Sequence, residues 1–190
     1  MYQKTVLDNG LRVISETMPQ THSASICIFV GVGSRYETNT RAGISHFVEH
    51  MLFRGTEKRP TSHDISEAIE GVGGSLNGGT DRESTVYWCK VARPHFEMAL
   101  DVLSDMLLNS KLDSEDIEKE RQVIIEEINM CYDSPSSKVG LIIEKLLWPA
   151  DPLGRDIAGT KKSVLATRRE DLVGYIQKQY IPSATVVSVA

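Results

Sequence analysis

The segment 43–53 limits what this chain can fold into more than any other stretch. Its spacing is helical, and its apolar side chains are Phe47, Val48, Met51, Leu52 and Phe53. A helix that is apolar nearly all round is buried in a core rather than laid on a surface. The same segment contains three ionisable side chains, namely His46, Glu49 and His50. Ionisable groups inside a core need a partner there, so this segment is both a core element and a candidate site.

The order of the remaining patterns predicts the fold class. Residues 5–7 and 11–16 flank Asp8-Asn9-Gly10, and an Asn-Gly step favours the tight turn of a hairpin. Further strands are expected at 23–32, 85–91 and 185–190, and helices at 43–53, 62–69 (with Ser62 as N-cap), 94–108, 113–132, 138–147 and 169–180. Strands early, helices late and one closing strand predict an α+β fold, a largely antiparallel sheet with helices packed on one face.

Length and charge exclude several classes of protein. A chain of 190 residues can bury one substantial core, so we expect a single domain spanning residues 1–190. The 26 acidic and 21 basic residues give a net charge of -5 and form no run of like charge, so we expect no nucleic-acid partner. No apolar run reaches the roughly 18 residues of a membrane span, so we expect no membrane partner.

The cysteines and the N-terminus predict the compartment. Cys27, Cys89 and Cys131 are odd in number, widely spaced and embedded in apolar patterns. This arrangement predicts small core residues rather than a disulfide framework. The first residues show neither a signal peptide nor a transit peptide. We therefore expect a cytoplasmic protein.

The two histidines of the buried segment are spaced to hold one metal ion. His46 and His50 are four positions apart, so on a helix they lie one above the other, about 6 Å along the axis. Glu49 lies at the edge of the same face, where it is better placed as a general base than as a ligand. The order His-x-x-Glu-His reverses the better-known zinc helix. The alternative is a chance pattern of surface histidines, but the apolar neighbours favour a site.

A second helix offers carboxylates for the same ion. On a wheel that starts at Ile117, Glu120 and Glu127 fall near the centre of the apolar arc. The other members of that arc are Val123, Ile124, Ile128, Met130 and Cys131. Two unpaired carboxylates there would cost several kcal/mol. A zinc ion would meet that need, and the alternative is that one or both pair with a buried arginine.

At this point the residues match a known family. The matching stretches are Leu7-Asp8-Asn9-Gly10-Leu11-Arg12-Val13, Gly33-Ser34-Arg35-Tyr36-Glu37, Phe53-Arg54-Gly55-Thr56, residues 73–80, Glu120-Arg121-Gln122-Val123-Ile124, Pro152-Leu153-Gly154-Arg155 with Gly159-Thr160, and Tyr180-Ile181-Pro182. Together with His46-Phe47-Val48-Glu49-His50, they make the chain resemble the pitrilysin-like M16 zinc metallopeptidases, above all their bacterial and mitochondrial-processing-peptidase-like branch. The resemblance covers essentially the whole chain.

The resemblance implies a role for each candidate residue. One Zn²⁺ per chain would be held by His46, His50 and Glu127, which follows His50 by 77 positions as in the family. Glu49 would be the general base and Glu120 a second carboxylate that supports catalysis. The implied activity is that of a zinc metalloendopeptidase, which hydrolyses peptide bonds of unfolded peptides or presequences. The implied fold is an α+β half-unit with a mixed sheet.

The resemblance also implies where a peptide would bind. Family members hold the substrate as an added edge strand, and residues 74–80 match that strand, with Asn77 and Gly78 as substrate-binding residues. Glycines there would let another backbone approach closely. Gly78 stands where the family usually has alanine. The alternative is that this stretch is a glycine-rich turn.

Finally, the resemblance implies a larger assembly. Residues 185–190 are an apolar strand with no turn signal after it, so we expect this chain to be the N-terminal half-unit of a longer two-half protein. In the family a second half or subunit supplies an Arg/Tyr pair, and the units form dimers or larger chambers. The alternative function is a non-catalytic, chamber-forming subunit, which the intact His46, Glu49, His50 and Glu127 disfavour. A purely structural zinc site is disfavoured because such sites lean on cysteine ligands.

Overall fold

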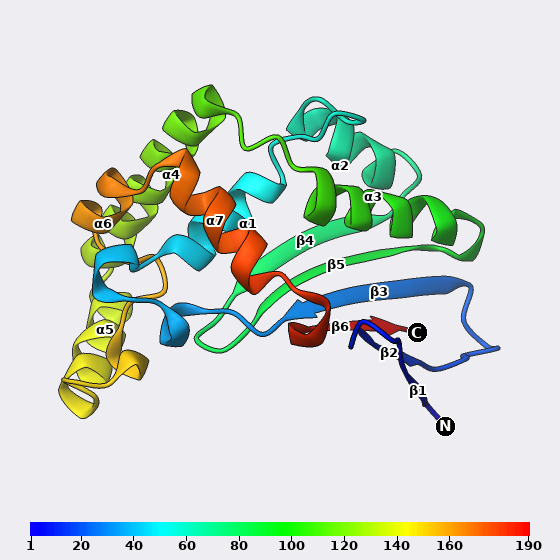
Figure 1. The fold of residues 1–190 in the computed structure, drawn as a ribbon, viewed down its shortest axis with the longest axis horizontal. Helices are drawn as coiled ribbons and strands as arrows, with labels where there is room; N and C mark the ends of the chain where they lie inside the picture. The colour runs from blue at the N-terminus through cyan, green and yellow to red at the C-terminus, as the bar shows by residue number, and fades with distance from the viewer.

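The computed structural model describes residues 1–190 and consists of one six-stranded sheet and the helices that cover it. The strands are β1 (Gln3–Val6), β2 (Arg12–Ser15), β3 (Ser23–Val30), β4 (Ser75–Thr80), β5 (Thr85–Ala92) and β6 (Thr185–Val189). The helices are α1 (Ile44–Leu52), α2 (Ser62–Glu70), α3 (Phe96–Asn109), α4 (Ser114–Asp133), α5 (Pro135–Leu147), α6 (Lys161–Ala166) and α7 (Arg169–Gln179). Figure 1 shows them on one side of the sheet.

The sheet is mixed and mostly antiparallel. Its strand order is β1-β2-β6-β3-β5-β4, and only the β2–β6 pair is parallel. The predicted hairpin joins β1 to β2. At the opposite edge β4 pairs with β5 alone. The predicted α+β class and the mixed sheet are confirmed.

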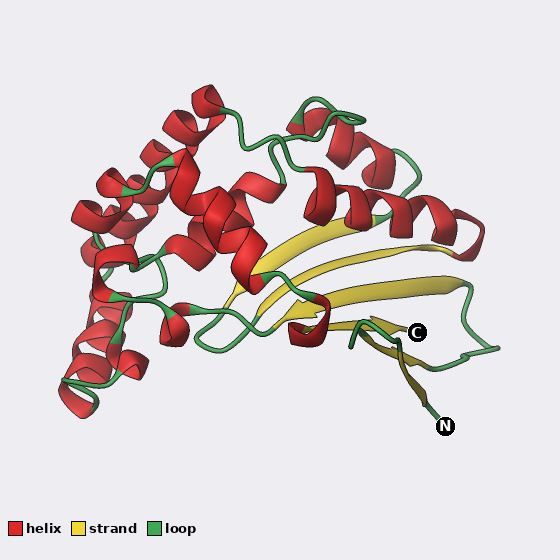
Figure 2. Cartoon of the chain, in the orientation of Figure 1, coloured by secondary structure: helices red, strands yellow, loops and turns green.

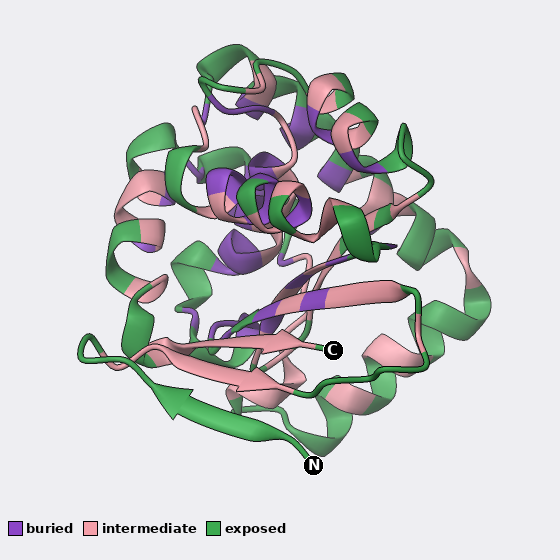
Figure 3. Ribbon diagram, turned by 90° about the vertical axis from the view of Figure 1, so that its right-hand side faces the viewer, coloured by how far each residue is buried: buried purple, intermediate pink, exposed green.

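Each central strand buries one face. Along β5, Thr85, Tyr87, Cys89 and Val91 are buried, while the alternating Val86 and Trp88 are only half-buried. Successive side chains of a strand point to opposite faces, so the buried face is the one under the helices (Figure 2). In Figure 3 the buried residues gather between the sheet and the helices, whereas β1 is exposed. The prediction that helices cover one face is confirmed.

Helix α1 lies inside this core and is fixed at its N-terminus. Its buried residues are Ile44, Ser45, Phe47, Val48, Met51 and Leu52. The carboxylate of Glu37 accepts hydrogen bonds from the backbone N–H groups of Gly43 and Ser45, each at 2.8 Å. These are N–H groups that a helix cannot satisfy internally. The Ser45 hydroxyl lies 2.8 Å from the Tyr175 hydroxyl on α7, which fixes the helix from another side.

Two glycines bring the entrance of α1 against a distant loop. Gly43 has φ +88°, and a Cβ there would lie 2.4 Å from the Ala158 oxygen. Gly159 has φ +77°, and its Cβ would lie 2.2 Å from the Ala42 oxygen. Both conformations favour glycine, and neither contact leaves space for a side chain. The Gly159-Thr160 pair in the sequence is thereby explained by backbone packing next to α1.

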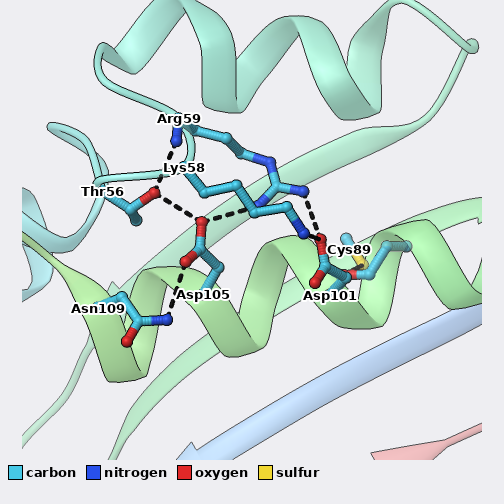
Figure 4. A network of polar contacts seen from close by, with 8 residues as sticks. Thr56, Lys58, Arg59, Cys89, Asp101, Asp105 and Asn109 are labelled. Atoms are coloured by element: carbon cyan, nitrogen blue, oxygen red, sulfur yellow. Dashed lines mark hydrogen bonds and ion pairs between the residues drawn. The ribbon is translucent and has the colours of Figure 1, made fainter.

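A polar network ties the loop after α1 to α3 (Figure 4). Asp105, 6% exposed, accepts hydrogen bonds from Thr56 Oγ1 at 2.6 Å and from Arg59 Nη1 at 2.7 Å. Arg59 also donates to Asp101 at 2.6 Å, and so does Lys58 at the same distance. Because the loop starts where α1 ends, this network also limits the movement of the end of α1.

The face that α4 buries differs from the predicted one. Its buried residues are Ile117, Glu120, Arg121, Ile124 and Ile128, whereas Val123, Met130 and Cys131 of the expected arc are exposed. The reason is Arg121, whose guanidinium reaches the backbone oxygens of Val164 and Thr167 near α6. The buried face of α4 therefore includes Arg121, with Glu120 inside it and the half-buried Glu127 at its border.

Smaller differences concern caps and cysteines. Thr61 rather than Ser62 caps α2, since its hydroxyl accepts a hydrogen bond from the backbone N–H of Asp64. Helix α6 was not predicted, and Thr160 caps it. Cys89 is buried as expected, but Cys131 is exposed, and all three cysteines are free. No helix is long and apolar enough to cross a lipid bilayer.

Candidate metal centre

Three side chains from two helices converge where α1 meets α4. The Nε2 atoms of His46 and His50 lie 3.1 Å apart, and each lies 3.6 Å from Glu127 Oε2. Donors at roughly 2.0–2.2 Å from a tetrahedral zinc ion lie about 3.3–3.6 Å from one another. Two imidazole nitrogens and one carboxylate oxygen, with no cysteine, match a catalytic rather than a structural zinc site. This donor set therefore fits zinc in both chemistry and spacing.

Glu120 fixes the orientation of His50. Its carboxylate, 2% exposed, lies 2.8 Å from His50 Nδ1. A carboxylate only accepts hydrogen bonds, so Nδ1 carries the proton and Nε2 keeps its lone pair directed at Glu127 and His46. This is the tautomer that a metal ion requires, and a carboxylate behind a ligating histidine is the usual device that selects it.

Arg54 pairs with the other oxygen of Glu120. The sequence offered a metal site or an arginine as partners for Glu120 and Glu127. Glu120 pairs with an arginine, and Glu127 lies with the two histidines. Sequence reasoning did not select Arg54. Arg54 lies in the loop after α1, which ends at Leu52, so the helical spacing of the site gives no signal for it.

His46 reaches the cluster without a partner on its far side. Its Nδ1 is buried and has no hydrogen-bond partner. Burial, with a smaller contribution from His50, lowers the pKa of His46 to about 4. The imidazole is thus neutral near pH 7 with one proton to place, and a cation bound at Nε2 would put that proton on Nδ1.

Glu49 stands beside the cluster and is not part of it. The Thr80 hydroxyl donates to Glu49 Oε2 at 2.6 Å. Burial raises the pKa of Glu49, although the Thr80 hydrogen bond and His50 oppose that change. Glu49 borders two pockets, one of about 530 Å³ shared with His46 and Glu127 and one of about 350 Å³ shared with His50 and Glu120. A carboxylate of raised basicity next to a candidate metal site is suited to accept a proton.

The predicted substrate strand is the regular edge strand β4, so the alternative of a glycine-rich turn is wrong. Asn77 is exposed and borders the smaller pocket together with His50 and Glu120. Its side-chain oxygen accepts a hydrogen bond from the backbone N–H of Gly78 at 2.8 Å. Gly78 lies beneath the Phe53 ring, where a Cβ would come within 2.9 Å of Phe53 Cε2. The absence of a side chain at Gly78 lets Phe53 close over the strand.

Comparison with known proteins gives the family. The sequence profile described as "Insulinase (Peptidase family M16)" matches residues 12–161. The chain belongs to peptidase family M16. This M16 chain is 42% identical over 187 residues to an uncharacterized zinc protease of Mycobacterium leprae (strain TN), and the match covers 98% of this chain and 42% of the relative. It is 38% identical over 183 residues to the mitochondrial-processing peptidase subunit beta of Lentinula edodes, covering 96% of this chain and 39% of that protein.

A solved structure has the same fold. A protease from Helicobacter pylori superposes with a TM-score of 0.94 at 22% identity, covering 100% of the M16 chain and 46% of the other chain. The M16 chain spans less than half the length of these relatives. Its own cluster of His46, His50 and Glu127 could hold a metal ion.

Proposed function

We propose that this chain is the catalytic, zinc-holding domain of a metalloendopeptidase that hydrolyses peptide bonds of unfolded peptides or presequences. The observation that carries the proposal is the convergence of His46 Nε2, His50 Nε2 and Glu127 Oε2 within 4.8 Å, with Glu49 beside them. The metal ligands would be His46, His50 and Glu127. When bound, zinc would polarise a carbonyl and lower the pKa of a water to about 7.

The other residues of the site would orient groups and move protons. Glu49 would accept the proton of the attacking water and pass it to the leaving amine. Glu120 would hold His50 in its tautomer through Nδ1, and Arg54 would keep the Glu120 carboxylate in place. Each role places a charge before the reaction starts, so little reorganisation is needed in the transition state.

The unpaired edge of β4 supports peptide binding. It presents backbone N–H and C=O groups that another extended chain can pair with. Asn77 and Gly78 lie on this strand, and Asn77 borders the pocket that His50 also lines. A substrate bound in this way would have to be extended, which favours unfolded peptides over folded proteins.

We further propose that the domain, residues 1–190, works with a second M16-like half or subunit. The support is the length of the relatives, of which this chain matches less than half. The partner would supply the Arg/Tyr pair that the resemblance implies, in a dimer or larger oligomer. The cytoplasmic location is likewise a proposal, based on the free cysteines.

The test uses the full-length protein that contains this chain. Zinc content and cleavage of a quenched fluorescent peptide are measured for the parent and for Glu49→Gln. We expect one zinc per site in both proteins and a loss of hydrolysis by several orders of magnitude in Glu49→Gln, because its amide cannot take the proton.

Two other outcomes would contradict the role of Glu49 or the proposed catalytic function. Loss of zinc together with activity in Glu49→Gln would make Glu49 a ligand and contradict its role as base. A zinc-loaded parent that binds unfolded peptides without cleaving them would favour the non-catalytic, chamber-forming subunit instead.

A further inference from the structure

Glu49 has a single side-chain partner. Its one side-chain hydrogen bond is the one that Thr80 Oγ1 donates to Oε2 at 2.6 Å, the Thr80 backbone N–H adds a weaker influence, and no lysine or arginine pairs with it. A half-buried carboxylate that borders two pockets can otherwise adopt several rotamers. The Thr80 hydroxyl therefore selects the position of the Glu49 carboxylate.

Thr80 is itself held firmly. It is the last residue of β4 and lies directly opposite Thr85 of β5, which is fully buried. The Thr85 hydroxyl is within reach of both Thr80 Oγ1, at 3.4 Å, and the Val32 oxygen, at 3.3 Å. Threonine is branched at Cβ and is stiff about χ1. Its hydroxyl thus has a nearly fixed place at the end of the hairpin.

The chemistry of the two groups fixes the direction of their hydrogen bond. A carboxylate has no proton to give when ionised, so Thr80 donates and Glu49 accepts. Bonds from a hydroxyl to a carboxylate are short and strong, as the 2.6 Å distance indicates. Oε2 accepts from Thr80, whereas Oε1 accepts no hydrogen bond from another side chain.

We propose that Thr80 is a positioning residue for Glu49 and couples the placement of the general base to the strand that receives the peptide. The inference rests on the proposed function. Thr80 belongs to β4. The same strand would therefore hold both the bound peptide, through its edge, and the Glu49 carboxylate, through the Thr80 hydroxyl. Movement of β4 would displace substrate and base together, which keeps the reacting bond and the base in register.

The test compares substitutions at Thr80 in the full-length, zinc-loaded protein. Thr80→Val keeps the shape and removes the hydroxyl, Thr80→Ala removes both, and Thr80→Ser keeps the hydroxyl alone. Thr185→Val is the matched control, since Thr185 lies on β6 and its hydroxyl bonds only to the Ile181 oxygen. For each variant, zinc content, thermal unfolding, kcat and KM are measured.

We expect Thr80→Val and Thr80→Ala to lower kcat about 10- to 100-fold, with zinc content and KM close to the parent values. Thr80→Ser should recover most of kcat, and Thr185→Val should match the parent. The idea is overturned if Thr80→Val and Thr80→Ala keep kcat within about twofold, or if Thr80→Ser is as impaired as Thr80→Val. Loss of zinc or of the fold in both deletion variants would assign the hydroxyl a structural role and overturn it as well.

A second readout does not depend on catalysis. A crystal structure of Thr80→Val should show the Glu49 carboxylate in a different rotamer or in several, while β4 and the ligands stay in place. An unmoved Glu49 would refute the inference even in a protein that cleaves nothing. A parent that holds zinc and leaves peptides intact would contradict the proposed function, and the Glu49 rotamer would still decide the role of Thr80.

Discussion

The pair formed by Glu120 and His50 allows a quantitative prediction for Glu120→Gln. The substitution keeps the size of the side chain and removes its charge. In the parent, Glu120 is 2% exposed, accepts from His50 Nδ1 at 2.8 Å and pairs with Arg54. The amide can present its NH₂ to His50 as easily as its oxygen, so the tautomer with a free Nε2 is no longer enforced.

Glu120→Gln should weaken zinc binding and lower the stability of the fold. Loss of the carboxylate behind a ligating histidine weakens metal binding about 10- to 100-fold, which is about 1.4–2.7 kcal/mol. Removal of one partner of a fully buried ion pair costs about 3–5 kcal/mol. Arg54 is 34% exposed and can turn toward water, so we expect the metal-free fold to lose only about 1–3 kcal/mol.

Zinc affinity is read by competition with a fluorescent chelator, and stability by urea unfolding with a strong chelator present. The matched control is Glu126→Gln on the same helix, because Glu126 is exposed and makes no hydrogen bond or ion pair. The reasoning is refuted if Glu120→Gln binds zinc within about twofold of the parent, as the control should.

Three further predictions concern stability and pH. Burial lowers the pKa of His46 from 6.5 to about 4. As the pH falls through that interval, His46 gains a proton in the unfolded chain before it does in the folded one. The free energy of unfolding of the metal-free protein should therefore decrease by about 3 kcal/mol. Urea unfolding at several pH values should show this slope, and His46→Gln should flatten it; an equal slope in both proteins would contradict the assignment. Gly43→Ala should lower the melting temperature strongly, because its Cβ would strike the Ala158 oxygen at φ +88°, whereas Gly79→Ala, with nothing within 4 Å, should unfold close to the parent. Asp105→Ala should lower the free energy of unfolding in urea by about 2 kcal/mol, since it removes the buried acceptor that Thr56 and Arg59 share while Arg59 keeps its bond to Asp101, and a loss no larger than that of an exposed aspartate would argue against that network.

The sequence predicts much of this fold because its signals are local. The Asn9-Gly10 turn, the alternation along residues 85–91 and the helical spacing of 43–53 each need only neighbouring residues. The rotation of α4 was missed because it depends on Arg121, whose partners Val164 and Thr167 lie far along the chain. A helical wheel treats arginine as polar and outward, and it cannot show that distant carbonyl groups satisfy the guanidinium.

The site also contains residues that local spacing predicts and residues that only the packing of distant elements brings in. His46, Glu49 and His50 are fixed relative to one another by one helix, so their spacing alone predicts their arrangement. Arg54 and Thr80 are placed by a loop and by an edge strand, and their contacts with Glu120 and Glu49 exist only after α1, α4 and β4 pack together. Glu37 was missed as a cap for the same reason, since it bonds Gly43 and Ser45 from outside the helix.

The central claim, that Glu127 completes a zinc site with His46 and His50, is tested most directly by zinc content after dialysis in Glu127→Gln and Glu126→Gln. Glu127 Oε2 lies 3.6 Å from both histidine nitrogens, while the adjacent Glu126 is exposed on the other side of α4. We expect Glu127→Gln to lose most of its zinc, because a neutral amide replaces the one anionic donor, and Glu126→Gln to keep one zinc per chain. Equal zinc in the two variants, or loss only in Glu126→Gln, would contradict the assignment of the third ligand.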